Sequence, residues 1–186
     1  MELIVEQTGK VLYKSQPKQS IFHKMIADRN KTGIEYFVFG GARGGGKSEC
    51  LRWQAISDCL ETPGIRVLLL RSSYPELQRT HIERIQLQLP QGMGAYNDQK
   101  KKYTFVNGSV LQFGHGDNKR DFKKYLSDEY EVIMIDEMTT IPFDFLLLLF
   151  TSLRTTKNFK PYVAGGTNPG DISHIYVKSF FIDKDF

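Results

Sequence analysis

A glycine-rich segment of eight residues has the composition and spacing of a phosphate-binding loop. It reads Gly41-Ala-Arg-Gly-Gly-Gly-Lys47-Ser48, which matches the pattern Gly-x-x-x-x-Gly-Lys-Ser/Thr at every position. Glycines let successive backbone N–H groups turn toward a β-phosphate, and a helix that begins at Lys47 adds the positive end of its dipole. We expect Lys47 to contact the β- and γ-phosphates and the Ser48 hydroxyl to ligate Mg²⁺. The segment therefore predicts a site for a nucleoside triphosphate.

A second segment supplies the carboxylates that such a site needs. The apolar run Val132–Ile135 ends in Asp136 and Glu137. A carboxylate at the end of a buried strand holds Mg²⁺, directly or through a bound water, in the Walker B motif. The adjacent Glu137 is placed to act as a general base on an attacking water. This pair favours hydrolysis over phosphate transfer to a second substrate, because a nucleotide kinase needs no water-activating base.

Two further segments have nucleotide-binding interpretations. Gly165-Gly-Thr-Asn-Pro169 follows the next apolar run, and its small polar side chains are suited to sensing a γ-phosphate. The alternative is a plain turn built from Gly, Asn and Pro. Asn118-Lys-Arg-Asp121 fits the guanine-reading pattern of GTPases, but it precedes Asp136, and the chain has no Asp-x-x-Gly segment. We interpret it as a solvated basic loop.

Alternating apolar runs and turn signals around these motifs predict one α/β domain over residues 1–186. Short, wholly apolar runs are typical of parallel strands that are covered on both faces. The dipeptide Asn107-Gly108 between two alternating runs predicts a hairpin. We expect strands at 36–39, 67–70, 102–106, 110–113, 132–135 and 162–165, and helices at 47–60, 76–89 and 143–153.

Composition sets outer limits on the class of protein. Forty per cent of the residues are apolar and 12% are aromatic, which is enough for a hydrophobic core. The net charge of +4 leans toward anionic partners. No apolar stretch is long enough to cross a bilayer or to serve as a signal peptide, so we expect neither secretion nor membrane insertion. Cys50 and Cys59 are expected to be free thiols in a reducing cytoplasm.

The motifs together resemble the large subunit of bacteriophage terminases. The likeness extends from about residue 16 to about residue 179, and the lesser motifs occur in the order and spacing of that family. It is carried by Pro17-Lys-Gln19, Arg43 within the P-loop, Leu70-Arg-Ser-Ser-Tyr-Pro75, Gly108-Ser-Val-Leu-Gln-Phe113, Ile135-Asp-Glu137 and Thr167-Asn-Pro169.

The resemblance implies an ASCE/RecA-like P-loop fold, with a mainly parallel central sheet flanked by helices and a β-hairpin insertion. It implies an ATPase whose hydrolysis drives double-stranded viral DNA into a procapsid. Catalytic roles fall to Glu137, Lys47, Arg43 and Arg154, and the Mg²⁺ ligands are Ser48 and Asp136. The nucleotide-binding residues are Gln19, Gly41, Ala42, Arg43, Gly44, Gly45, Gly46, Lys47, Ser48, Thr167 and Asn168.

Individual roles follow from the same resemblance. Gln19 would contact adenine and Arg43 the γ-phosphate, while Thr167 and Asn168 match the motif that couples hydrolysis to domain movement. Arg154 would act as a finger inserted into a neighbouring subunit's site. The alternative for Arg154 is an arginine that caps the end of a helix.

Partners are implied as well: double-stranded DNA, the portal protein, the small terminase subunit and further copies of the chain in a ring. The implied location is the cytoplasm of the infected bacterial host, with assembly on the procapsid. Family members usually continue into a nuclease domain, and we expect none in this chain. DNA contact would be non-specific and to the backbone. Candidates are the basic residues Lys100, Lys101, Lys102, Lys119, Arg120, Lys123 and Lys124, although solvated charge is the commoner explanation for such runs.

Three other functions fit parts of the pattern. A helicase-like or DNA-repair ATPase shares the core chemistry and would prefer single strands or unwind duplexes. A GTP-driven switch would read guanine through Asn118 and Asp121. A non-enzymatic assembly adaptor would bind nucleotide without turnover, which Glu137 argues against.

Overall fold

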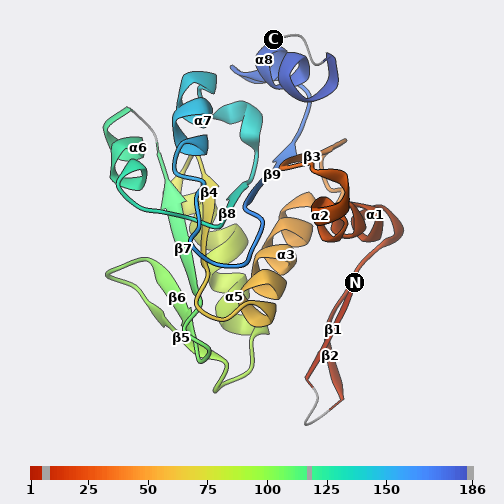
Figure 1. Cartoon of the computed structure of the whole chain (residues 1–186), viewed down its shortest axis with the longest axis vertical. Helices are drawn as coiled ribbons and strands as arrows, with labels where there is room; N and C mark the ends of the chain where they lie inside the picture. Colours follow the sequence, from red (N-terminus) through yellow and green to blue (C-terminus); the bar gives the residue numbers. More distant parts are fainter. Residues whose placement is uncertain (6–8, 117–118, 184–186) are drawn as a thin grey trace.

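The computed structural model describes residues 1–5, 9–116 and 119–183 and places a seven-stranded sheet between two layers of helices (Figure 1). The strand order is β3-β9-β8-β4-β7-β6-β5. Strands β3, β9, β8, β4 and β7 are parallel, and β6 and β5 add an antiparallel extension at one edge. The strands are β3 (Tyr36–Gly40), β4 (Arg66–Arg71), β5 (Gly94–Asn97), β6 (Lys102–Phe105), β7 (Val110–His115), β8 (Val132–Ile135) and β9 (Tyr162–Thr167).

Strand β9 lies between the strand that leads into the P-loop, β3, and the strand that ends in Asp136, β8. This order, with one strand between the two that carry the P-loop and Asp136, is the ASCE/RecA-like arrangement that the family resemblance implies. The carboxyl ends of these parallel strands meet at one edge of the sheet, which is where α/β folds bind their ligands. The expected α/β architecture with a mainly parallel sheet is confirmed.

The wholly apolar strands are explained by a hydrophobic core on each face of the sheet. Within β4, Val67 and Leu69 face one core while Leu68 and Leu70 face the other, and all four are fully buried. Strand β8 alternates in the same way. Successive side chains of a strand point to opposite faces, so a strand covered on both sides is apolar at every position.

The helices form the two outer layers (Figure 1). One core holds side chains of α1, α3 and α5, and the other holds side chains of α6, α7 and α8. The helices are α1 (Pro17–Ala27), α2 (Arg29–Thr32), α3 (Lys47–Glu61), α4 (Tyr74–Leu77), α5 (Glu83–Gln88), α6 (Lys119–Leu126), α7 (Phe143–Phe150) and α8 (His174–Lys178). A π-helical turn, Gln78–Ile82, joins α4 to α5, a 3-10 turn spans Met138–Thr140, and a second π-helical turn, Ser179–Asp183, follows α8.

Two expected helices have different bounds. The helix expected at 76–89 begins at Tyr74, because Pro75 favours a first helical turn, and the π-helical turn interrupts it. The helix expected at 143–153 ends at Phe150. It ends early because Leu153 forms an isolated parallel bridge with Tyr130, and that pairing requires extended backbone.

The predicted hairpin is present, and both of its strands belong to the main sheet. Strand β6 pairs with β7 as expected, but β7 also pairs with β4 in parallel, and β5 adds a third antiparallel strand. The chain also begins with an unpredicted hairpin, β1 (Glu2–Val5) with β2 (Lys10–Lys14), which projects from the body beside α1 (Figure 1).

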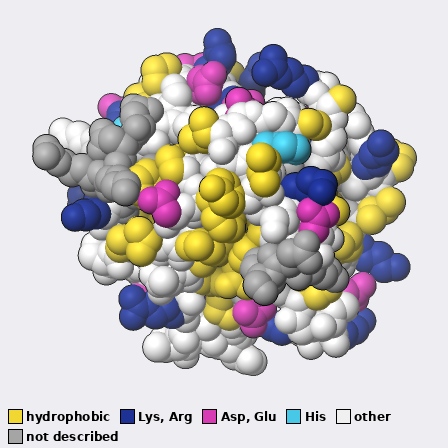
Figure 2. Space-filling view, turned by 90° about the horizontal axis from the view of Figure 1, so that it is seen from above, with side chains coloured by type: hydrophobic (Ala, Val, Ile, Leu, Met, Phe, Trp, Pro, Cys, Tyr) yellow, Lys and Arg dark blue, Asp and Glu magenta, His cyan; other side chains and the backbone are white. Residues whose placement is uncertain are grey.

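Cys50 and Cys59 are free and buried, as expected. In the part of the chain that the structure describes, no helix is long and apolar enough to span a membrane. Figure 2 shows hydrophobic side chains gathered across the end of the molecule where α8 lies. The exposed apolar residues of α7 and α8 and their flanking turns are Leu147, Leu148, Ile172, Ile175, Tyr176 and Ile182.

Candidate active site

The P-loop connects β3 to α3 and has the backbone conformation that its glycines predict. Gly41, Gly44 and Gly46 have φ angles of 143°, 79° and 69°, a region that L-residues rarely adopt. Gly46 is the N-cap of α3, so the free N–H groups of the first helical turn face the space above the loop. Backbone donors and a helix dipole that converge there form an anion site.

Lys47 folds back over the loop that precedes it. Its Nζ donates hydrogen bonds to the carbonyl oxygens of Gly41, at 3.1 Å, and Ala42, at 2.7 Å. Burial lowers the pKa of Lys47, and the negative charges of Asp136 and Glu137 oppose that shift. A phosphate in the loop would offer this ammonium group a stronger acceptor than either carbonyl.

Asp136 lies next to Ser48, so the two residues that the sequence assigns to Mg²⁺ meet. Ser48 Oγ is 3.0 Å from Asp136 Oδ1, which also accepts the backbone N–H of Glu137 at 3.1 Å. Burial alone would raise the pKa of Asp136, yet the hydrogen bond from His81 and the charge of Arg71 outweigh it and hold the pKa below the usual value. One hydroxyl and one ionised carboxylate side by side fit Mg²⁺, which takes few protein ligands besides phosphate and water.

Arg71 binds both carboxylates of the Asp-Glu pair. Its Nη1 is 2.8 Å from Asp136 Oδ2, and its Nη2 is 2.9 Å from Glu137 Oε2. The register of the sheet produces this contact: β4 pairs with β8 through Leu70 and Ile135, so the next residue of each strand reaches the same edge. Glu137 has a φ of 52°, a sparsely populated conformation for a residue with a side chain that is often found at functional sites.

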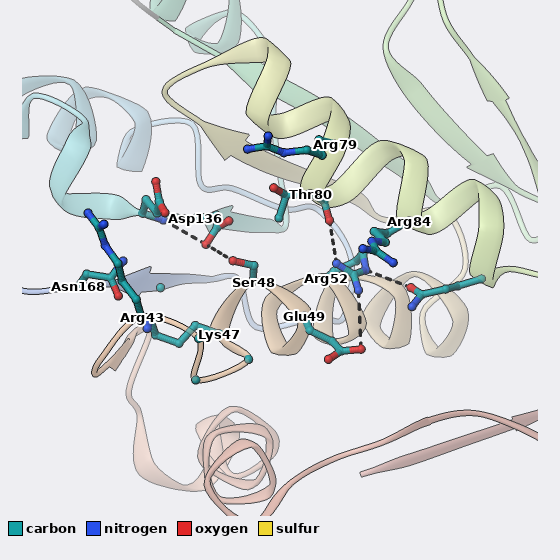
Figure 3. Close-up of a pocket in the computed structure, with 16 residues that line it drawn as sticks. Arg43, Lys47, Ser48, Glu49, Arg52, Arg79, Thr80, Arg84, Asp136 and Asn168 are labelled. Carbon is teal, nitrogen blue, oxygen red and sulfur yellow. Dashed lines mark hydrogen bonds and ion pairs between the residues drawn. The ribbon is translucent and has the colours of Figure 1, made fainter.

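An open cavity of about 720 Å³ lies between the P-loop and the helical segment that contains Arg79, Thr80 and Arg84 (Figure 3). The volume is within the range of sites for small-molecule ligands. Arginines approach it from both sides, which suits a highly charged anion. The cavity is lined by Arg43, Gly44, Gly45, Gly46, Lys47, Ser48, Glu49, Arg52, Arg79, Thr80, Arg84, Gln88, Asp136, Glu137, Gly166 and Asn168.

Comparison with known protein families agrees with this geometry. The model of the N-terminal part of the terminase large subunit, T4likevirus type, matches residues 38–180. This span includes the P-loop, the Asp136-Glu137 pair and the segment around Thr167. The chain belongs to this terminase family. No curated protein sequence matches the chain.

Solved terminase structures share the fold of this family member. The large terminase of the thermophilic bacteriophage D6E has a TM-score of 0.75 at 12% identity, over 92% of this chain and 43% of its own. The ATPase domain of the Thermus phage P74-26 large terminase has a TM-score of 0.62 at 16% identity, over 88% of this chain and 68% of its own. A chain of the phi-29 genome packaging motor has a TM-score of 0.54 at 18% identity, over 82% of this chain and 50% of its own. The chain thus spans less than half of the D6E protein.

The terminase chain brings the third predicted segment to the cavity through close packing. Gly165 and Gly166 belong to β9 and not to the turn that follows. A Cβ on Gly166 would lie 3.1 Å from Leu51 Cδ1, which is tight, and at the contact distances of 3.4 and 3.6 Å from Asp136 Oδ1 and Lys47 Cβ, so glycine lets the end of the strand pack closely against α3 beside the site. Asn168 lines the cavity, and its Oδ1 is buried with no partner among the described residues. Thr167 does not line the cavity, and its Oγ1 lies 3.4 Å from Thr139 Oγ1.

Gln19 of the terminase chain is buried beneath the P-loop. Its Nε2 donates to the carbonyl oxygen of Gly46 at 2.9 Å, and its Oε1 accepts from the backbone N–H of Gln16 and the hydroxyl of Tyr13. In this conformation the amide is occupied by protein partners. Gly46 uses one of the two N–H groups of Nε2, whereas both acceptor positions of Oε1 are used, so a paired contact of Gln19 with adenine would require one of the bonds to Oε1 to be exchanged for the base.

Arg154 lies near the amino end of the central strand β8, whereas the cavity lies at the carboxyl ends of the parallel strands. Its backbone N–H donates to the carbonyl oxygen of Tyr130, which precedes β8, whereas Asp136 follows that strand. Six residues of extended chain separate Tyr130 from Asp136, which is a distance of about 20 Å. Its side chain is half-exposed and is 3.7 Å from Glu129. Arg154 is therefore not part of the chain's own cavity. Asn118 lies outside the described residues, and the side chain of Asp121 is not described.

Two kinds of site residue in this chain are not predicted by the sequence motifs. The first is Arg71, which lies in a segment that resembles the terminase family but has no predicted role. It ends the apolar strand β4, and a residue at the end of a strand parallel to β8 is expected at the same edge of the sheet as Asp136. His81, Arg79, Thr80 and Arg84 come from the helical segment beyond β4. The sequence gives no comparable signal for them, because the π-helical turn sets which side chains face the cavity.

Proposed function

We propose that the chain hydrolyses ATP and that this hydrolysis drives translocation of double-stranded viral DNA into a procapsid. The observation that carries the proposal is the meeting of Ser48, Asp136 and Glu137 at the mouth of a P-loop, in a chain of the terminase family. The D6E large terminase has been solved with ADP and with ATP-gamma-S, and the phi-29 structure is a genome packaging motor. We therefore assign the chain as a motor domain and ATP as its substrate.

The residues divide the binding of the triphosphate between them. The P-loop N–H groups hold the β-phosphate, and Lys47 leaves its two carbonyl partners to contact the β- and γ-phosphates. Ser48 and Asp136 would hold Mg²⁺, which when bound neutralises charge on the β- and γ-phosphate oxygens. Arg43 is exposed in the loop and free to reach the γ-phosphate.

Glu137 accepts the proton in the hydrolytic step. A water attacks the γ-phosphorus, the bond from that phosphorus to the β–γ bridging oxygen breaks, and ADP and phosphate leave. The water's proton passes to Glu137, which Arg71 holds through Oε2 while Oε1 stays available. Asn168, with its unpartnered Oδ1 at the cavity, and the adjacent Thr167 would report loss of the γ-phosphate to the rest of the molecule.

The motor is proposed to work as a ring of copies on the portal protein, with the small terminase subunit, in the cytoplasm of the infected host. Arg154 supports this arrangement because it is exposed and lies near the amino end of β8, away from its own cavity. A neighbouring copy would receive this arginine as a finger. The portal, the procapsid and the ring are implied by family membership and are part of the proposal.

Phosphate release from ATP and from GTP tests the proposal directly. We expect turnover of ATP, a rate per subunit that rises with protein concentration as neighbours supply Arg154, and stimulation by duplex DNA rather than by single strands. Measurement with each nucleotide and each DNA form gives the answer. Preference for single strands would favour a helicase-like ATPase, turnover of GTP alone would favour the switch, and tight binding without turnover would favour the adaptor.

The basic segments predicted to contact DNA meet in the folded chain. A pocket of about 280 Å³ is lined by Lys100, Lys101 and Lys124 together with Gln112, His115, several aromatic rings and Asp128, whose carboxylate is paired with Arg66. Lys101 is paired with Asp98 at 2.8 Å, whereas Lys100 and Lys124 are exposed and have no carboxylate partner among the described contacts. Two cations from separate segments at one pocket suit successive phosphates of a DNA backbone.

The double variant Lys100→Ala with Lys124→Ala is expected to bind duplex DNA more weakly whatever its sequence. Each lost phosphate contact reduces the slope of log affinity against log salt by about one, so the double variant should lose about two. Fluorescence anisotropy over a salt series measures the slope. The matched control is Lys18→Ala with Lys24→Ala, two exposed lysines of α1. Equal slopes in the two double variants would exclude the pocket as a DNA contact.

A further inference from the structure

His81 is a fully buried histidine that touches the carboxylate assigned to Mg²⁺. Its side chain has no exposure to solvent, and its Nε2 is 3.0 Å from Asp136 Oδ2. Its other ring nitrogen, Nδ1, has no hydrogen-bond partner among the described residues. No role for His81 follows from the P-loop or the Walker B motif.

The contact fixes which nitrogen carries the proton. An ionised carboxylate oxygen can only accept, so the N–H is on Nε2 and points at Asp136. Nδ1, on the other side of the ring, is buried and makes no hydrogen bond to the described residues.

The two carboxylate oxygens of Asp136 accept hydrogen bonds from different sets of residues. Oδ2 accepts from His81 Nε2 and from Arg71 Nη1, whereas Oδ1 lies 3.0 Å from the Ser48 hydroxyl. With both acceptor positions of Oδ2 used, the carboxylate cannot rotate without breaking two bonds. Oδ1 is thereby held on the side where the Mg²⁺ ligands meet.

The π-helical turn Gln78–Ile82 delivers His81 to this position, and two arginines hold the turn in place. Arg52 Nη1 donates to the carbonyl oxygen of Thr80 at 2.9 Å, and Arg71 Nη1 is 3.2 Å from the Thr80 hydroxyl. Both arginines are buried. A wider turn of this kind often occurs at functional sites, where it redirects one side chain.

Packing alone does not account for a histidine here. An apolar side chain would fill the same space without burying an unpaired ring nitrogen, which is unfavourable. We propose that His81 is a positioning residue for Asp136, and that its Nε2–H orients the carboxylate for the metal of bound Mg²⁺-ATP. The inference rests on the proposed function, since it takes Mg²⁺-ATP as the ligand.

The affinity for nucleotide has two parts, the affinity for the metal-free nucleotide and the increase in affinity that Mg²⁺ gives, and the proposal assigns His81 to the second. The P-loop and Lys47 bind phosphates with or without Mg²⁺, and His81 touches neither. A variant that loses the Nε2–H should therefore keep its affinity for the metal-free nucleotide and lose the gain that Mg²⁺ provides. Loss of a residue that orients a metal ligand typically costs 10- to 100-fold in metal affinity.

Glutamine and methionine at position 81 form a matched pair, because they have similar shape and only glutamine keeps an N–H donor. Binding of ATP-γ-S is measured in Mg²⁺ and in EDTA for the wild type, His81→Gln and His81→Met. We expect the ratio of the two affinities to fall by about 10- to 100-fold in His81→Met and to stay within threefold of wild type in His81→Gln. Affinity in EDTA should be unchanged. Gln78→Leu, an exposed position on the same turn, is the control.

Each outcome decides between the two proposals. A full Mg²⁺ gain in His81→Met would overturn the role of His81 and leave the proposed function intact. A wild type that binds no ATP-γ-S would overturn the proposed function itself. If His81→Met does not fold, His81→Ala replaces it in the comparison. Failure of both to fold, with His81→Gln folded, would show that the bond is structural and would also overturn the inference.

Discussion

Glu137→Gln is expected to lower ATP turnover by about 10²- to 10⁴-fold while ATP still binds. Glutamine keeps the size of the side chain and an oxygen that can accept from Arg71, so the local structure should persist. It cannot take a proton from the attacking water, because an amide is not a base near neutral pH. Phosphate release and equilibrium binding of ATP, measured on the same preparation, separate the two effects.

Glu76→Gln is the matched control for this experiment. Glu76 is a second glutamate bound to Arg71, with its Oε2 3.2 Å from Arg71 Nε, but it does not line the cavity. We expect its replacement to change turnover by less than threefold. Glu137→Gln with wild-type turnover would mean that another group activates the water. Loss of ATP binding in Glu137→Gln would mean that the residue holds the nucleotide rather than the water.

The sequence predicts the part of the site that depends on short segments. A P-loop is local: its glycines, Lys47 and Ser48 are fixed by one strand, one turn and one helix. The apolar strand before Asp136 is local in the same sense, and its burial on both faces is visible in its composition. The meeting of Ser48 and Asp136 was predictable because parallel strands end at one edge of the sheet.

The rest of the site depends on distant pairings that composition does not encode. Arg71 reaches Asp136 because β4 pairs with β8 in one particular register. His81 reaches it because of a π-helical turn whose extra residue has no sequence signal. Gln19 lies under Gly46 because α1 packs on the P-loop. Its polar side chain is therefore buried, although glutamine is a residue type that is usually exposed.

The second large effect is expected from Arg71→Met, which removes the only cation bound to both Asp136 and Glu137 among the described residues. Arg71 and Asp136 have side chains that are 8% and 2% exposed. Loss of the arginine leaves the buried charge of Asp136 with hydrogen bonds but without its paired cation, and we expect the free energy of unfolding to fall by about 3–5 kcal/mol. Urea denaturation at neutral pH measures the change.

A residue at the opposite end of the same strand makes the control for Arg71→Met. Arg66 pairs with Asp128 at 3.3 Å, and their side chains are 43% and 42% exposed, so Arg66→Met should cost less than about 1 kcal/mol. Addition of Asp136→Asn to Arg71→Met removes the stranded charge and should restore much of the lost stability, although not the activity. Equal losses in Arg71→Met and Arg66→Met, or no recovery in the double variant, would mean that the arginine contributes through packing and that the charge of Asp136 is stabilised by its other hydrogen bonds. Recovery would show that a single cation from β4 keeps the metal-binding carboxylate ionised inside the fold.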